Sequence, residues 1–332
     1  MPVDSNPNVS VIIPVYNGAR HILAALNSVF EQTYQDLEIL VIDDGSTDET
    51  KSSIEHYIRN RTIQYIYQSN RGLSSARNAA IRSAAGRFLK FLDCDDILYP
   101  KQIELQVDHL KDQRNIISMT DHVLAFENGK EKISHIDLGK TNQLARFITG
   151  NFTPVHSILV ETDLVKAAGG FDEQLTSLED ADLWIRLLFR GVQFEKVDYV
   201  GCCYRVFENS LSSHSDQMFF NKCRISERVN DFLLSAQDSM DPEVLEAVLL
   251  NNTRLIEGCF IRGLKPEKHL NKTLAFSEVL FLRYKTGFRK IFLQSFGLQA
   301  WIRLKHHWNC LRFKNYQNAL RFDEIKWRNA AS

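Results

Sequence analysis

The stretch VSVIIPVYNGARHILAALNSVFEQTYQDLEILVIDDGS, residues 9–46, decides the fold. It holds two short runs rich in β-branched residues, Val9 to Tyr16 and Leu37 to Ile42. Between them, the apolar residues from Ala19 to Phe30 recur with helical spacing. Two strands joined by such a helix form a βαβ unit, in which the strands run parallel.

The same alternation continues toward residue 92. It predicts a helix over Thr47 to Ile58, a strand over Ile63 to Tyr67, a helix over Ser75 to Ala85 and a strand over Arg87 to Leu92. Ser46 and Glu49 have the spacing of a capping box and so predict where the first of these helices begins. The fold class is therefore α/β, Rossmann-like, with a mostly parallel central sheet and helices on both faces.

The pattern changes after residue 116, where shorter runs surround Asn128-Gly129 and predict a hairpin in a sheet that becomes mixed. A strand over Ser157 to Val160, a helix over Asp180 to Arg190 and a strand over Phe194 to Arg205 follow. Beyond them the spacing is helical, with breaks at Lys265-Pro266 and at Gly287. We expect an α/β domain over 8–215 and a helical C-terminal extension over 216–332.

Composition excludes several classes of protein. The 332 residues are 44% hydrophobic and 24% charged with a formal net charge of −1, which argues against disorder and against a nucleic-acid partner. The six cysteines form no CxxC pair, which favours reduced thiols in the cytosol. The N-terminal MPVDSNPN does not resemble a signal peptide, and no apolar run is long enough to span a bilayer. We expect a cytoplasmic protein whose membrane contact, if any, is peripheral.

Polar residues follow three of the predicted strands. They are Pro14-Val15-Tyr16-Asn17-Gly18, Asp43-Asp44-Gly45-Ser46 and Asp93-Cys94-Asp95-Asp96. Because ligands of parallel α/β sheets bind beyond the carboxyl ends of the strands, the three clusters are expected at one edge of the sheet.

The acidic residues of these clusters allow two interpretations. Asp44 is suited to bind a base or a ribose hydroxyl, but Asp-Gly-Ser is also ordinary turn chemistry. Asp93, Asp95 and Asp96 crowd three carboxylates that repel one another, and Mg²⁺ or Mn²⁺ bridging to a diphosphate would relieve that repulsion. For Asp96, and as the second interpretation for Asp93 and Asp95, the alternative is a solvated acidic turn before a helix whose N-terminus favours Asp.

A fourth acidic cluster, Glu179-Asp180, lies at a predicted helix start. Asp180 is a candidate general base, and an N-cap is the alternative. Asp182 and Arg186, four residues apart, predict an ion pair on the helix surface.

Taken together, six stretches in this order resemble the family 2 glycosyltransferases with a GT-A fold, over roughly residues 8–210. They are VSVIIPVYNG, VIDDGSTDET, GLSSARNAAI, GRFLKFLDCDD, GGFDE and LEDADLWIRL. The resemblance implies a metal-dependent enzyme that transfers a hexosyl or N-acetylhexosaminyl group from a nucleotide-sugar, UDP-linked by default, and inverts the anomeric centre in one displacement. A catalytically inactive nucleotide-sugar-binding module with the same fold is the alternative.

The resemblance also assigns residues. It implies that Pro14, Tyr16 and Asp44 surround the base with Arg77 nearby, that Asp93 and Asp95 form a DxD motif for ribose and Mg²⁺ or Mn²⁺, and that Asp180 is the catalytic base. Two rivals fit less well. The chain lacks the G-x-G-x-x-G of a dinucleotide-dependent oxidoreductase after its first strand, and it lacks the glycine-rich opening loop of a sugar-nucleotide pyrophosphorylase.

Features outside the six stretches refine this expectation. The chain has no Q-x-x-R-W motif of processive members, which favours a single or distributive transfer. His214 is a further candidate metal ligand, with a solvated loop histidine as the alternative. The acceptor is expected to be a glycan or a lipid-linked glycan of surface polysaccharide biosynthesis.

The C-terminal extension carries an apolar stripe with basic neighbours. The stripe consists of Trp301, Leu304, Trp308 and Leu311. Such a segment lies on the inner face of an anionic membrane or packs against the rest of the protein with its charges in water, and the sequence leaves both interpretations open.

Overall fold

The computed structural model describes residues 7–139, 142–150, 153–207, 215–235 and 241–273. The chain divides into two compact units, and the boundary falls between Ile225 and Ser226, inside helix α8 (Ser215–Ser235). The domain division after residue 215 stays a prediction, because a compact unit is not by itself a domain that folds alone.

Half of the sheet in the first unit is parallel. Strand β1 (Val9–Val15) lies between β2 (Leu37–Asp43) and β4 (Phe88–Phe91), and β3 (Gln64–Tyr67) flanks β2. These four strands pair in parallel register, for example Ile12 opposite Leu40 and Phe91. The βαβ rhythm of the sequence is confirmed here, and the carboxyl ends of the four strands share one edge.

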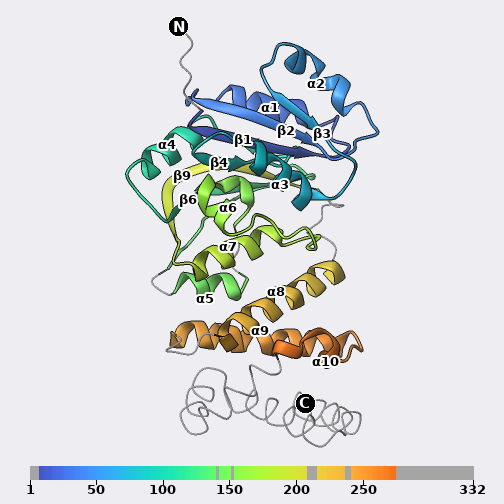
Figure 1. The fold of residues 1–332 in the computed structure, drawn as a ribbon, viewed down its shortest axis with the longest axis vertical. Helices are drawn as coiled ribbons and strands as arrows, with labels where there is room; N and C mark the ends of the chain where they lie inside the picture. Colours follow the sequence, from blue (N-terminus) through green and yellow to red (C-terminus); the bar gives the residue numbers. More distant parts are fainter. Residues whose placement is uncertain (1–6, 140–141, 151–152, 208–214, 236–240, 274–332) are drawn as a thin grey trace, which may run out of the picture. The chain divides into compact units, whose positions relative to one another are not determined.

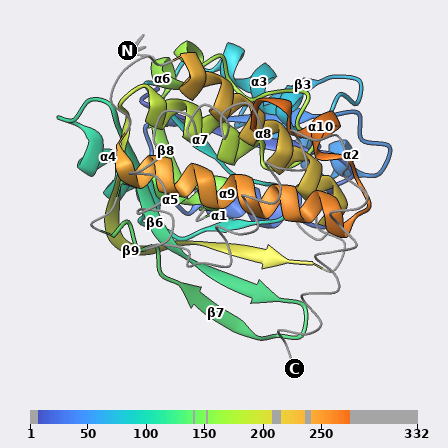
Figure 2. The same ribbon diagram turned by 90° about the horizontal axis from the view of Figure 1, so that it is seen from below.

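The other half of the sheet is mixed, as expected from the change of pattern after residue 116. Strand β8 (Ile158–Glu161) is antiparallel to both β4 and β6 (Ile116–Phe126), and β9 (Gln193–Val206) is parallel to β6. Strand β5 (Ile97–Leu98) pairs with β9, and β7 (Glu131–Ser134) forms the predicted hairpin with β6. Figure 2 shows β7 at the outer edge, beside β6.

Helices cover both faces of the sheet (Figure 1). Helices α1 (Ile22–Phe30), α2 (Thr50–Arg59) and α4 (Gln102–Leu110) pack on one face, where alternate residues of β1 enter the core. Each large aliphatic side chain buried in this way contributes about 1.5–3 kcal/mol. Helix α3 (Leu73–Ser83) packs against β1 and β2 from the other face.

Shorter elements complete the first unit. Helix α5 (Gln143–Ile148) and a 3₁₀ turn, η1 (Val155–Ser157), precede β8. Helix α6 (Thr162–Ala167) follows β8, and α7 (Glu179–Phe189) leads into β9. The predicted helix at residue 180 is thus confirmed as α7, one residue earlier.

The capping box expected at Ser46 and Glu49 is wrong. Helix α2 begins only at Thr50, and its N-cap Glu49 makes no side-chain cap hydrogen bond. Ser46 instead belongs to the preceding loop, where its hydroxyl accepts a hydrogen bond from the Asn17 N–H at 2.9 Å. The serine therefore joins two loops rather than starting a helix.

The described part of the second unit is helical. It contains the end of α8, α9 (Pro242–Ile261) and α10 (Pro266–His269), so the break at Lys265-Pro266 is confirmed. Asn230 and Asn252 are buried and hydrogen-bond to each other at 2.9 Å. Gly287 and the stripe over Trp301 to Leu311 lie outside the described residues. Within the part that the structure describes, no helix is long and apolar enough to cross a membrane.

Candidate active site

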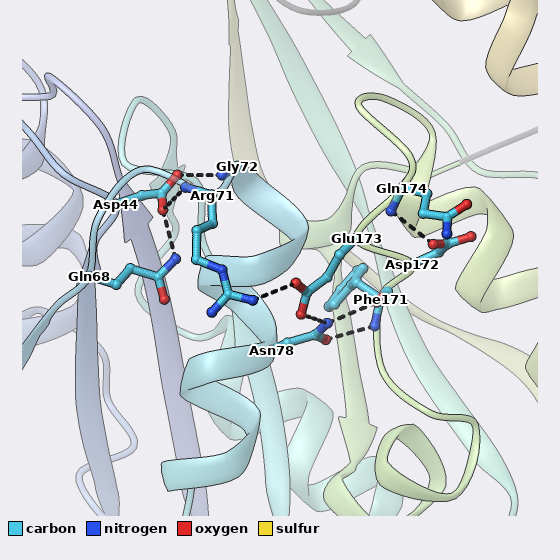
Figure 3. A network of polar contacts seen from close by, with 9 residues as sticks. All are labelled: Asp44, Gln68, Arg71, Gly72, Asn78, Phe171, Asp172, Glu173 and Gln174. Atoms are coloured by element: carbon cyan, nitrogen blue, oxygen red, sulfur yellow. Dashed lines mark hydrogen bonds and ion pairs between the residues drawn. The ribbon is translucent and has the colours of Figure 1, made fainter.

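Asp44, at the end of β2, is 4% exposed and is surrounded by donors of the chain itself. One carboxylate oxygen accepts from the Gln68 side chain at 2.7 Å and the Arg71 N–H at 2.9 Å, and the other accepts from the Gly72 N–H at 2.8 Å. Figure 3 shows these three groups converging on Asp44. Gly72 is the N-cap of α3, so the carboxylate fixes the start of that helix.

The loop after β2 approaches the loop before α3 too closely for a side chain at residue 45. Gly45 has a φ of +82°, and a Cβ there would lie 2.7 Å from the Asn70 nitrogen. Asp43 holds the same loop through the Ser46 N–H at 2.7 Å and the Tyr65 hydroxyl at 2.6 Å. A glycine is therefore required beside Asp44.

Pro14 and Tyr16 lie at the carboxyl end of β1, as the sequence predicts. Pro14 pairs with Ile42, beyond the point where β4 stops pairing with β1, so its missing N–H breaks no bond to β4. Pro14 is buried, whereas the Tyr16 side chain is 52% exposed. Tyr16 thus presents an aromatic face at the edge where the clusters meet.

The first loop also contacts the acidic turn that follows β4. A Cβ at Gly18 would lie 3.1 Å from the sulfur of Cys94 and 2.5 Å from a methyl group of Val15. The Gly18 N–H donates to the Thr50 hydroxyl at 2.9 Å. Together with the hydrogen bond from Asn17 to Ser46, this packing brings the first cluster into contact with both of the others.

Arg77 connects the acidic turn to the start of α7. It projects from α3 with only 2% of its side chain exposed, and it donates to Asp93 at 2.6 Å and to Glu179 at 2.5 Å. Its guanidinium lies 5.2 Å from the centre of the Phe171 ring. Burial alone would lower the pKa of Arg77, but the charges of Asp93, Glu179 and Asp180 raise it, so the cation is permanent.

Asp180 is the second residue of α7 and is partly exposed. Its carboxylate accepts from the Ala181 N–H at 2.7 Å, and no other hydrogen bond to it occurs among the described residues. Desolvation and the negative charge of Glu179 raise the pKa of Asp180 to about 7, against the opposing effect of Arg77. Leu178, the N-cap of α7, has a left-handed backbone with a φ of +60°.

Asp95 is the second carboxylate with a raised pKa. Burial and the neighbouring charges of Asp96 and Asp93 raise the pKa of Asp95 to about 7. This is the repulsion expected from three crowded acids, and a cation at this turn would relieve it.

Asp96 and His156 form a pair that sequence reasoning did not find. Both side chains are 1% exposed, and Asp96 Oδ2 lies 3.0 Å from His156 Nδ1, within ion-pair distance. Burial disfavours the charged imidazole, yet Asp96 raises the pKa of His156 well above its usual range. The other oxygen of Asp96 accepts from the Arg205 N–H at 2.8 Å. The solvated position considered for Asp96 is wrong.

One group of potential metal ligands gathers here in the part of the chain that the structure describes. It comprises Asp93, Asp96 and His156, whose ligand atoms lie within 4.8 Å of one another. Asp95 lies outside this group and follows Asp93 by two residues. His214, the further candidate, lies outside the described residues.

The segment before α7 is tied to α3. Asn78 donates to the Phe171 carbonyl at 2.9 Å and accepts from the Phe171 N–H at 2.8 Å. Figure 3 shows Arg71 reaching from the Asp44 loop toward Glu173, with a contact of 3.2 Å. Helix α3 therefore contacts the end of β2, the end of β4 and the segment that leads to Asp180.

Part of the chain is similar to known proteins. Residues 10–166 match the family model described as glycosyl transferase family 2. An uncharacterized glycosyltransferase of Rickettsia typhi is 34% identical over 195 residues, which cover 55% of this chain and 59% of that protein. The Escherichia coli protein WfaP, named UDP-Glc:alpha-D-GlcNAc-diphosphoundecaprenol beta-1,3-glucosyltransferase, is 28% identical over 208 residues, with coverages of 62% and 80%. The chain spans 37% to 59% of the length of the first three curated relatives it matches.

Two solved structures share the fold. Staphylococcus aureus TarS 1-349 in complex with UDP-GlcNAc has a TM-score of 0.57 at 20% identity and covers 90% of this chain and 80% of its own. The mannosyltransferase PcManGT of Pyrobaculum calidifontis, in complex with GDP-Man and Mn²⁺, has a TM-score of 0.55 at 17% identity, with coverages of 95% and 83%. Residues 10–166 of this chain therefore match glycosyl transferase family 2, and the sheet has the GT-A fold of these structures.

Proposed function

We propose that the chain is an inverting glycosyltransferase that moves a sugar from a nucleoside diphosphate onto an acceptor hydroxyl. The observation that carries the proposal is the position of Arg77. This buried cation pairs with Asp93, which follows β4, and with Glu179, the neighbour of Asp180. It supports a single site in which the acidic turn faces the diphosphate and Asp180 accepts the proton of the acceptor hydroxyl. An inactive binding module has no need of a base with a perturbed pKa at this place.

Asp180 is the proposed general base. Its pKa of about 7 lies near neutral pH, where a carboxylate both exists in its ionised form and accepts a proton effectively. The acceptor oxygen forms a bond to the anomeric carbon, its proton passes to Asp180, and the bond from that carbon to the diphosphate oxygen breaks on the opposite face. The anomeric configuration inverts and no covalent intermediate forms.

Tyr16 and Pro14 are proposed to contact the nucleobase of the donor. The ring of Tyr16 is exposed at the carboxyl edge of the sheet and offers a stacking surface. Three protein donors already bond to Asp44, which leaves part of its acceptor capacity for the donor substrate. Its main effect on binding is to hold the loop at Arg71 and Gly72 in place.

Asp93 and Asp95 are proposed to hold a divalent cation. The residues fit such an ion, because Asp95 has a raised pKa beside two other acids, and because the ligand atoms of Asp93, Asp96 and His156 lie within 4.8 Å of one another at the same turn. Carboxylate oxygens suit Mg²⁺ or Mn²⁺. When bound, the cation neutralises negative charge on the leaving diphosphate. Arg77 keeps Asp93 oriented toward the same place.

The donor and acceptor are proposed from relatives. TarS and PcManGT were solved with UDP-GlcNAc and GDP-Man, and WfaP is named for transfer from UDP-Glc to a lipid-linked sugar. We propose a UDP-sugar donor and a glycan or lipid-linked glycan acceptor of surface polysaccharide biosynthesis, with one sugar added per encounter. Peripheral membrane contact through the apolar stripe from Trp301 to Leu311 and its basic neighbours is part of the same proposal.

The test is nucleotide release by the purified full chain. Panels of UDP-, GDP- and TDP-sugars are incubated with a lipid-linked or glycan acceptor, with Mn²⁺ or EDTA, and released nucleoside diphosphate is measured. The proposal expects release that EDTA abolishes and that Asp95→Ala reduces by at least about 100-fold. The matched control is Asp108→Asn, an exposed acid on α4, which should retain full turnover. An inert wild-type protein that still binds the nucleotide would establish the binding module instead, and full turnover by Asp95→Ala would reject the metal assignment.

A further inference from the structure

Helix α8 makes hydrogen bonds to residues 174–177, the segment that precedes the proposed base Asp180. Asn221 donates to the Ser177 hydroxyl at 2.9 Å and to the Thr176 hydroxyl at 3.1 Å. Arg224 donates to the Gln174 carbonyl at 2.7 Å, and Gln217 reaches the Thr176 carbonyl at 3.5 Å. The three α8 residues are spaced i, i+4 and i+7, so they lie on one face of the helix. All of these contacts lie within the first compact unit.

The contact between Asn221 and Ser177 is the buried one of this set. Each residue is 4% exposed, whereas Arg224 is exposed and the Gln217 bond is long. A buried amide or hydroxyl that loses its partner keeps the cost of its desolvation without the compensating hydrogen bond. The bond between these two side chains is therefore strongly favoured, and it fixes Ser177 relative to α8.

Ser177 directly precedes the strained residue of this segment. Leu178 has a φ of +60° and a ψ of +20°, a left-handed conformation that is sterically unfavourable for a non-glycine residue. Such a conformation persists only where its surroundings determine it. On its far side, Glu179 is held by Arg77 at 2.5 Å, so Leu178 lies between two anchors, Asn221 and Arg77.

We infer that Asn221 is a positioning residue for Asp180 and that the first turns of α8 therefore belong to the active site. Asn221 does not touch the substrate. It holds Ser177 and Thr176, which in turn keep Leu178 in the conformation that starts α7 at Glu179 and aims the Asp180 carboxylate. This inference rests on the proposed function, in which Asp180 removes the acceptor proton.

The sequence alone hides this role. The motifs of the family end before α8, and α8 lies in the part of the chain that we assigned to a helical extension. Its polar residues Gln217, Asn221 and Arg224 look like an ordinary solvated helix face. Their partners in the Gln174 to Ser177 segment can be identified only from the fold.

The experiment compares four variants of the full chain: Asn221→Ala, Ser177→Ala, the double variant, and Lys222→Ala as the control on an exposed neighbouring position of α8. Steady-state kinetics give kcat and the donor KM, with the folded fraction measured by circular dichroism under the same conditions. We expect Asn221→Ala to lower kcat by about 10- to 100-fold with the donor KM changed less than twofold, since a misplaced catalytic group affects the chemical step. The double variant should be no worse than the worse single variant, because both remove the same bond.

Hydrogen exchange provides a readout that needs no turnover. The backbone amides of residues 178–183 should exchange at least about tenfold faster in Asn221→Ala than in the wild type or Lys222→Ala. A kcat of Asn221→Ala equal to that of Lys222→Ala, or independent additive losses in the double variant, would overturn the inference. If the wild-type protein transfers no sugar, the proposed function fails, and unchanged exchange at 178–183 would then overturn the positioning role separately.

Discussion

The Arg77 guanidinium donates to the Asp93 carboxylate at 2.6 Å from a position where 2% of the arginine side chain is exposed. Glu179 shares the same cation, so Arg77→Met would leave two acids without their charge partner. We expect the variant to lose about 3–5 kcal/mol of unfolding free energy, measured by urea denaturation. Arg82→Met, at an exposed position of the same helix, should lose less than about 0.5 kcal/mol. Equal stabilities of the two variants would contradict the role of the buried cation.

The raised pKa of Asp180 predicts an acidic limb in the activity profile. The base must be ionised, so kcat/KM should fall as the pH drops below about 7, approaching tenfold per pH unit. Measurements at saturating Mn²⁺, which would keep Asp95 ionised if it binds the cation as proposed, isolate the effect of Asp180. Asp180→Asn should retain less than about 1% of the activity and show no such limb. An unchanged limb in the residual activity of Asp180→Asn would assign the titration to another group.

Gly45 and Gly129 form a matched pair for testing the loop at Asp44. Both have a positive φ, +82° and +77°, but only a Cβ at residue 45 meets the backbone, 2.7 Å from the Asn70 nitrogen. An alanine at either position should cost about 1 kcal/mol for the backbone conformation alone. Gly45→Ala should cost more and should also raise the donor KM several-fold, whereas Gly129→Ala should leave that KM unchanged. Equal donor KM values would show that the loop does not shape the nucleotide site.

Lys90 is fully buried in β4 and donates to Gln106 at 2.8 Å. Burial lowers its pKa from 10.5 to about 7, so between these two pH values the unfolded chain binds more protons at this residue than the folded chain does. The stability of the wild type should therefore rise with pH over that window, by up to about 1.4 kcal/mol per pH unit, relative to Lys90→Met. Urea denaturation at pH 7, 8 and 9 measures the difference. Lys132→Met, an exposed control, should run parallel to the wild type, and a parallel Lys90→Met would show that Lys90 stays protonated.

The sequence predicted the site residues that follow parallel strands, but it missed a site residue that precedes an antiparallel strand. Strands β1 to β4 are parallel, so the residues that follow them, Tyr16, Asp44 and Asp93, reach one edge as expected. Strand β8 runs antiparallel to β4, which brings the residues before β8, including His156, to that same edge. A rule based on carboxyl ends of strands misses such a residue, and no local pattern around His156 indicates its partner Asp96.

The sequence also predicted the ion pair of Asp182 and Arg186 without its burial or its contacts to other elements. Asp182 and Arg186 form the expected pair at 2.8 Å, but Asp182 is 1% exposed, so the prediction of a surface pair is wrong. Arg186 also bonds to the Gly170 carbonyl at 2.7 Å and so ties α7 to the end of α6. Spacing along a helix identifies such a pair, whereas its environment depends on the elements packed around it.

The missing side chain at Gly18 has a consequence for how this site can change. At Gly18 the first loop lies directly against Val15 and Cys94, so the loop proposed to bind the nucleotide is packed against the acidic turn. A single added methyl group would displace both together. Substitutions that adapt the enzyme to another donor should therefore accumulate at the rim, around exposed residues such as Tyr16, while residue 18 stays small.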